Sequence, residues 1–257
     1  MTHTAVLMYH EIDHGAPLCD PSAGYARFVV TEEVFARHMD VIAADGMRGV
    51  SLSAVLDDRA SESPRVVLTF DDGCGTDRMA ALDLLVPRGM GATFYVLAGR
   101  IGTPGYLSHA DVRAIADAPG CEIASHGWSH RFLSGLSDAE LRRELHDSHE
   151  LLSELSGREV RHLSCPGGRW SAEVARVARA VGYTSCTTSV VGLMTPQTDP
   201  FQIPRLAVRT ADSGEQVAEW CRGRGLALPM AVDTVRRTAR GLVGDETYAR
   251  VFRRFFR

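Results

Sequence analysis

The feature that most constrains the fold of this chain is the alternation of short β-rich apolar runs with segments of helical periodicity. Strands separated by helices form βαβ units, which require a parallel sheet with right-handed crossovers. Seven or eight such units in about 220 residues favour a single barrel over an open two-sided sheet, although periodicity alone does not decide between them. The predicted strands cover residues 5–9, 65–70, 92–97, 122–125, 160–164, 183–188 and 202–208.

The helical segments carry recognisable start and stop signals. The clearest helix runs from Ser137 to Ser156, where Ser137 and Glu140 form a capping box and leucines recur on one face before Gly157. We expect one barrel domain over residues 1–222 and a C-terminal extension over residues 223–257, with a linker near residues 223–230. Further helices are predicted to begin at Thr31, Thr76, Ser108, Ser171 and near Ser213.

Polar residues follow several of the predicted strands directly. His10 follows strand 5–9, Asp71 and Asp72 follow strand 65–70, and His126 follows strand 122–125. The carboxyl ends of parallel strands meet at one edge of a sheet, where active sites of α/β proteins are assembled. The sequence therefore predicts a functional site at this edge.

The residue types at this edge indicate a catalytic metal. His126 and His130 are four residues apart, a spacing that is weak evidence by itself in a chain with ten histidines. The adjacent carboxylates of Asp71 and Asp72 repel each other unless a cation or hydrogen bonds compensate. One carboxylate with two imidazoles supplies three ligands and leaves open positions for water and substrate. Zn²⁺ is the first expectation, and Fe(II), Co or Ni also suit these donors.

Two segments resemble the first two motifs of the polysaccharide deacetylase family (carbohydrate esterase family 4, the nodulation-protein-B homology domain). They are Thr-Phe-Asp-Asp-Gly at 69–73 and Ser-His-Gly-Trp-Ser-His at 125–130, and Leu-Ser-Cys-Pro-Gly-Gly at 163–168 resembles the third-motif loop. The resemblance covers roughly residues 5 to 210. It implies a distorted (β/α)7 barrel that binds one divalent metal, usually zinc, and hydrolyses the N-acetyl group of an amino sugar to acetate and a free amine.

The resemblance also implies a role for each motif residue. Asp72, His126 and His130 correspond to the metal ligands, and Asp71 corresponds to the general base. The third-motif loop consists of Cys165, Pro166, Gly167 and Gly168. Its glycines let the backbone approach a substrate, so a backbone N–H of this loop is a candidate oxyanion donor. Trp128 is a candidate wall for sugar stacking, with core or rim packing as the alternative.

Two features depart from the family pattern. Many members have an arginine before the third-motif proline and a C-terminal histidine as general acid, whereas this chain has Cys165 and no histidine after His162. It most resembles a subgroup with a Tyr-His dipeptide at the end of the first strand, where that histidine takes the place of the missing acid. His10 is therefore the predicted general acid; the alternative is that it only satisfies backbone groups. Arg205 and Arg169 are both candidates to orient Asp71, with a merely structural ion pair as the alternative for each.

Composition excludes several other classes of function. All 28 cationic side chains are arginine, so no lysine Schiff base can form, and a net charge of −4 argues against general nucleic-acid binding. The six cysteines are scattered without a C-x-x-C pair, which predicts neither a disulfide scaffold nor a zinc ribbon but reduced, mostly structural thiols. The first ten residues lack the basic segment and long apolar run of a signal peptide, so we expect a cytoplasmic protein.

The end of the chain has a different character. From residue 248 onward, apolar and arginine side chains fall on opposite faces of a predicted basic amphipathic helix. It either packs on the acidic barrel or associates with an anionic membrane surface. A cytoplasmic deacetylase would act on an intracellular amino sugar, a lipid-linked saccharide or an N-acetylated intermediate of a secondary metabolite.

Two other functions remain open at this stage. The same scaffold supports hydrolysis of another amide, such as a cyclic amide or ureide, because fold does not fix substrate. The chain could also be a catalytically silent carbohydrate-binding protein. The intact aspartates and histidines argue against that reading, and the missing C-terminal histidine argues for it.

Overall fold

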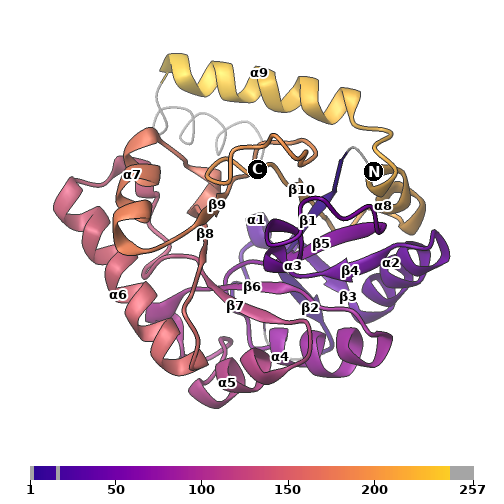
Figure 1. Ribbon diagram of the computed structural model, residues 1–257, viewed down its shortest axis with the longest axis horizontal. Helices are drawn as coiled ribbons and strands as arrows, with labels where there is room; N and C mark the ends of the chain where they lie inside the picture. Colours follow the sequence, from indigo (N-terminus) through magenta and orange to yellow (C-terminus); the bar gives the residue numbers. More distant parts are fainter. Residues whose placement is uncertain (1–2, 16–17, 244–257) are drawn as a thin grey trace.

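A curled sheet of parallel strands forms the centre of the computed structural model, which describes residues 3–15 and 18–243 (Figure 1). The strand order is β10-β1-β5-β6-β7-β8-β9, and β4 pairs with β5 beside this path. An isolated parallel bridge between Thr187 and Ile203 joins the end of β9 to the segment before β10, so the curl nearly closes. The strands are β1 Val6–Tyr9, β4 Arg48–Val50, β5 Arg65–Phe70, β6 Thr93–Val96, β7 Glu122–Ser125, β8 His162–Ser164, β9 Ser185–Thr187 and β10 Leu206–Ala207.

This architecture confirms the predicted distorted (β/α)7 barrel. All seven predicted strands are present, but the one expected over 202–208 is reduced to Leu206–Ala207. Pro204 has no N–H to give to a ladder, and the N–H of Arg205 donates to the carbonyl of Val190 instead. Sequence periodicity did not predict β4, nor the two-stranded parallel sheet of β2 (Glu11–Asp13) and β3 (Val29–Thr31), because these strands are only three residues long.

Helices cover the outside of the sheet, and most begin where the sequence predicts. The side chains of Thr31, Ser108, Ser137, Ser171 and Ser213 each accept a hydrogen bond from the backbone N–H three residues later. The helices are α1 Ala23–Ala26, α2 Glu32–Ala44, α3 Leu52–Leu56, α4 Asp77–Met79, α5 His109–Asp117, α6 Asp138–Ser156, α7 Ala172–Val181, α8 Gly214–Cys221 and α9 Ala227–Val243. The helix expected to begin at Thr76 is α-helical only over α4, and the chain continues as a π-helix over Ala80–Leu85.

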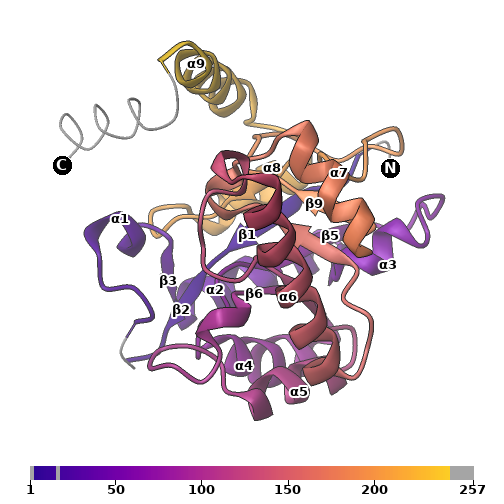
Figure 2. The ribbon, with the colours of Figure 1, turned by 90° about the vertical axis from the view of Figure 1, so that its left-hand side faces the viewer.

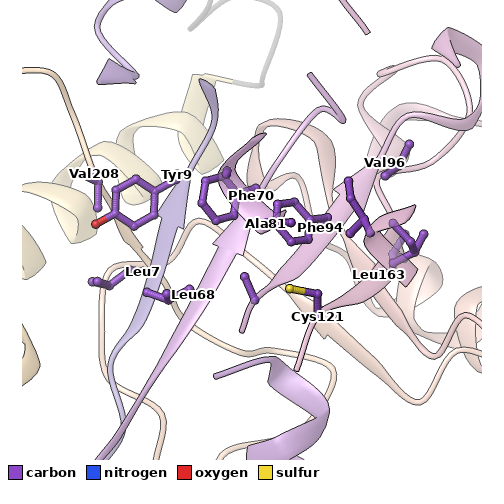
Figure 3. Close-up of a cluster of buried hydrophobic side chains, with 14 of the residues drawn as sticks. Leu7, Tyr9, Leu68, Phe70, Ala81, Phe94, Val96, Cys121, Leu163 and Val208 are labelled. Carbon is purple, nitrogen blue, oxygen red and sulfur yellow. The ribbon is translucent and has the colours of Figure 1, made fainter. Parts of the chain in front are cut away.

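Alternation along the strands separates the apolar core from the site. Leu68 and Phe70 of β5 lie in the main hydrophobic cluster with Phe94 (Figure 3). Successive side chains of a strand point to opposite faces. Thr69 and Asp71 therefore face the other side of the sheet, the interior of the curl.

The C-terminal helix α9 runs along one end of the molecule and stands outside the other helices (Figures 1 and 2). The N–H of Val191 donates to the carboxylate of Asp233 over 3.3 Å, and residues 222–226 connect α8 to α9. The basic amphipathic segment predicted from residue 248 lies outside the described residues. Among the helices of the described part of the chain, none has the length and apolar character needed to cross a bilayer.

Candidate metal centre and active site

The loops after β5 and β7 bring one carboxylate and two imidazoles together. Nε2 of His126 and Nε2 of His130 each lie 3.4 Å from Oδ1 of Asp72. Ligand atoms about 2.1 Å from a tetrahedral ion lie about 3.4 Å from each other, so this spacing fits one divalent metal. Oδ1 of Asp72 is also buried without a hydrogen-bond partner among the described residues, which leaves it available to a cation.

Backbone strain occurs at two of these three residues. Asp72 has φ 80° and His130 has φ 65°, and within the described ranges they are the non-glycine residues with positive φ. The left-handed conformation costs an ordinary residue roughly 1–2 kcal/mol. Such strain concentrates at functional sites, where the surrounding structure holds a side chain in one direction.

Hydrogen bonding and burial leave the imidazoles ready to bind a metal. Nδ1 of His126 donates to the carbonyl of Ser164 over 3.0 Å, which directs the lone pair of Nε2 toward Asp72. Burial lowers the pKa of His126 to about 3 and also lowers the pKa of His130. Burial raises the pKa of Asp72 to about 6, and the neighbouring Asp71 carboxylate adds to this effect. A bound cation would compensate the negative charge at this position.

Glu144 of α6 anchors the loop that carries His130. Its carboxylate accepts hydrogen bonds from the backbone N–H groups of Trp128 and Ser129, each over 3.0 Å. No sequence motif marks Glu144. The available signal was its place between Leu141 and Leu145 on the apolar face of the helix, where a carboxylate requires partners.

Asp71 is paired with Arg205. The guanidinium donates to both carboxylate oxygens over 2.7 and 2.8 Å, and the Ser164 hydroxyl donates to Asp71 over 3.2 Å. Burial alone would raise the pKa of Asp71, but the charge of Arg205 outweighs it and holds this pKa well below its usual range. The carboxylate is therefore ionised throughout the physiological range. Of the two predicted arginines, Arg205 meets Asp71, whereas Arg169 lies over the ring of Phe132, 4.9 Å from its centre.

Ser164 links the two halves of the site, and sequence patterns did not identify it. Its carbonyl accepts from His126, and its hydroxyl lies between Arg205 and Asp71. A serine at the end of a strand is common, so only the fold reveals these contacts.

His10 directly follows β1, whose last residue, Tyr9, pairs with Phe70 of β5, so His10 and Asp71 leave neighbouring strand ends. Its ring stacks on Phe28 with 4.6 Å between ring centres, and Nδ1 is buried without a hydrogen-bond partner among the described residues. Burial lowers the pKa of His10, while the charges of Asp72 and Asp71 act in the opposite direction.

The third-motif loop is held in a tight turn. Gly167 has φ 60° and Gly168 has φ 67°, and a Cβ on Gly168 would come within 2.5 Å of the Ser189 side chain. The thiol of Cys165 lies 3.3 Å from that of Cys186 on β9, so it packs in the core. Trp128 is 38% exposed, which places its indole at the surface of the site rather than in the core.

Known proteins resemble this chain in sequence and fold. The polysaccharide deacetylase family model matches residues 58–186. The chain is 28% identical over 214 residues to a putative polysaccharide deacetylase, YxkH of Bacillus subtilis, which covers 81% of this chain and 72% of the relative. It is 29% identical over 120 residues to a chitooligosaccharide deacetylase of Rhizobium leguminosarum, which covers 46% of this chain and 53% of the relative.

Two solved structures share the fold. The Streptococcus pyogenes deacetylase PplD, in complex with acetate, aligns with a TM-score of 0.74 and 20% identity over 84% of this chain and 96% of that one. IcaB from Ammonifex degensii aligns with a TM-score of 0.74 and 23% identity over 86% and 98%. The sequence match over residues 58–186 and this common barrel lead to one assignment: the chain belongs to the polysaccharide deacetylase family.

Proposed function

We propose that this protein removes the N-acetyl group of an amino sugar and releases acetate and a free amine. The observation that carries the proposal is the trio Asp72, His126 and His130, with 3.4 Å between ligand atoms, next to the Arg205-paired carboxylate of Asp71. Deacetylases among the relatives, one of them described as acting on chitooligosaccharides, support the choice of reaction. We propose zinc as the ion, with Co²⁺, Ni²⁺ and Fe²⁺ able to replace it.

Each residue has one role in this scheme. A divalent ion held by Asp72, His126 and His130 would make water more acidic and polarise the acetyl carbonyl. Asp71, ionised because Arg205 is paired with it, accepts the proton of the attacking water. His10 delivers a proton to the departing nitrogen, because an unprotonated amine is too basic to leave.

The third-motif loop supplies one more group. Pro166 has no N–H, the N–H of Cys165 donates to Thr187, and the N–H of Gly168 donates to the Cys165 carbonyl. We therefore assign the oxyanion contact to the N–H of Gly167. The exposed indole of Trp128 is the stacking surface for a sugar ring.

The proposed substrate is a GlcNAc-type saccharide met in the cytoplasm, free, lipid-linked or part of a secondary metabolite. We propose that residues 1–222 form the catalytic barrel and that the extension over residues 223–257 sets location or stability. Peripheral contact with the inner face of the membrane is the location that the arginine-rich end of the extension supports.

The test is a panel of acetylated saccharides incubated with the zinc-loaded protein, read by mass spectrometry for the loss of an acetyl group. Acetylated chitooligosaccharides, nucleotide sugars and lipid-linked saccharides form the panel, and cyclic amides and ureides form the comparison set. We expect deacetylation by the wild type and none by Asp71→Asn. Turnover of the comparison set alone would reassign the reaction, and binding of acetylated sugars without turnover would identify a silent carbohydrate-binding protein.

A further inference from the structure

A second group of metal-ligating side chains lies beside the first. Glu11 of β2, Cys19 and Cys74 have ligand atoms within 4.8 Å of one another. The two cysteines are 55 residues apart in sequence, and no spacing motif links them. Only the fold, which places the segment before α1 against the loop after β5, brings them together.

The contacts within this group converge on the two sulfur atoms. Sγ of Cys19 lies 2.9 Å from Sγ of Cys74, and the Tyr25 hydroxyl lies 3.1 and 3.0 Å from the two sulfurs. The Glu11 carboxylate accepts the N–H of Cys19 over 3.2 Å. Glu11 and Cys74 are both buried, and Cys19 is half-buried.

An unpartnered carboxylate next to these residues is a second, independent observation that favours cation binding here. Asp77 is 1% exposed, and neither carboxylate oxygen has a hydrogen-bond partner among the described residues. Burial raises its pKa well above the usual value. The backbone N–H of Asp77 donates to the carbonyl of Cys74 over 3.0 Å, so Asp77 lies next to the cluster in the chain and in space. A buried carboxyl group without a hydrogen-bond partner is costly, and coordination to a cation would offset that cost.

We propose that Glu11, Cys19 and Cys74 bind a second zinc ion, and that the carboxylate of Asp77, which lies outside their 4.8 Å group, turns in as the fourth ligand. Thiolates select zinc over magnesium or calcium. A zinc ion whose four ligands all come from the protein is typically structural rather than catalytic. Two thiolates and two carboxylates carry the same formal charge as the four thiolates of a Cys₄ zinc site. Binding releases the two thiol protons, and the proton that burial keeps on Asp77, to solvent.

The geometry requires two movements: the Asp77 carboxylate must turn toward the cluster, and the two thiols must separate. Two sulfurs that share a zinc at 2.3 Å lie about 3.8 Å apart, so the thiols must separate by about 1 Å from their present contact. Cys19 lies in a loop outside the helices and strands, and this loop can supply the shift. Cys74 is two residues from Asp72, so the second ion would tie down the same loop that carries the first site.

The test uses the full chain, purified under reducing conditions and loaded with zinc or cobalt. We expect two metal ions per chain, and we expect near-ultraviolet thiolate-to-cobalt absorption that Asp72, His126 and His130 cannot produce. Cys19→Ser and Cys74→Ser should each lose this absorption and one ion. His126→Ala should keep the absorption, and Cys121→Ser, at a buried cysteine outside the cluster, should keep both ions.

Two further variants address the oxygen ligands without removing a thiol. Glu11→Gln and Asp77→Asn keep the side-chain shape, and each should weaken zinc binding at this site by about tenfold or more. One ion per chain without thiolate absorption in the folded wild type would overturn the proposal. A wild-type mass lower by two hydrogens under the same reducing conditions would also overturn it, because Cys19 and Cys74 would then form a disulfide. Neither readout depends on turnover, so failure here is separate from failure of the proposed reaction.

Discussion

At the scale of single residues, Arg205 controls the charge of the site because it is the buried partner of Asp71. Arg205→Lys keeps a positive charge but cannot donate to both oxygens from a planar fork. Burial then raises the pKa of Asp71, and the acidic limb of kcat/KM should move to higher pH by about 1–3 units. A pH profile measures the shift. Arg169→Lys is the matched control, and a shift in that variant alone would transfer the orienting role to Arg169.

The same pairing makes folding depend on pH. The pKa of Asp71 is depressed in the folded state, so its pairing stabilises the protein above the unfolded value of about 3.9. That contribution is lost as the pH falls toward the folded-state pKa.

Asp71 and Asp72 are adjacent in sequence, and their surroundings predict opposite behaviour on mutation. Asp71→Asn removes the proton acceptor, so turnover should fall on the order of 10²-fold or more while the metal stays bound. Asp72→Asn removes a ligand, so the metal should be lost. Elemental analysis with single-turnover assays separates the two. Metal loss in Asp71→Asn and retention in Asp72→Asn would show that the two roles are reversed.

His10 should act on the proton of the leaving group and not on the metal. His10→Ala is expected to lower kcat by roughly 10²-fold or more, to leave metal content unchanged and to remove the alkaline limb of the pH profile. The alkaline limb marks the pH at which His10 loses its proton. Because burial lowers the pKa of His10 by more than Asp72 and Asp71 raise it, this limb should lie below the usual histidine pKa of about 6.5. A decrease below about tenfold with the limb intact would make His10 a structural residue.

At the scale of elements, strand ends were predictable and the contacts behind them were not. The sequence places His10, Asp71 and His126 directly after strands, and β1, β5 and β7 end at Tyr9, Phe70 and Ser125 as expected. Glu144 was not predictable as the anchor of the His130 loop, because its partners lie 15 and 16 residues away on another element.

The anchoring role of Glu144 gives an element-scale prediction. Glu144→Gln keeps the shape but replaces a charged acceptor of backbone N–H groups, so the loop holding His130 should loosen. We expect zinc affinity to fall on the order of tenfold, with helix α6 intact by circular dichroism. The control is Glu150→Gln, an exposed position on the same helix. Equal zinc affinity in the Glu144 and Glu150 variants would show that the loop keeps its shape without the anchor.

At the scale of the whole molecule, closure of the sheet explains why the strand ends that carry residues 10, 71 and 205 are neighbours. Strand β1 pairs with β5 on one side and with β10 on the other. His10 at the end of β1 therefore lies between the strand that leads to Asp71 and the segment that carries Arg205. His10 and Asp71 are candidates through the family resemblance, and Arg205 is a candidate because the usual third-motif arginine is absent. Spacing along the sequence carries no information on strand order, so only the fold shows that their strand ends lie together.

The extension is the part of the molecule farthest from this chemistry in sequence. Every residue assigned to the first metal site and to proton transfer lies at or before Arg205. Helix α9 follows these residues in the sequence and exposes the apolar side chains of Leu228, Met230 and Val235 to solvent. Deleting residues 235–257 removes the arginine-rich end and keeps Asp233, which accepts from Val191. Turnover of a small soluble substrate should therefore stay within a few-fold, since no assigned group is lost.

Liposome binding and melting temperature then distinguish the two roles of the extension. If the arginines meet a membrane, the deletion should weaken binding to anionic vesicles, and replacing Arg236 and Arg237 by Gln in the full chain should weaken it less. Vesicles of neutral lipid are the control, because the arginine contribution requires negative surface charge. Unchanged binding with a lower melting temperature would assign the extension to packing on the barrel. A loss of turnover well beyond a few-fold would contradict both roles and place part of residues 235–257 in the catalytic unit.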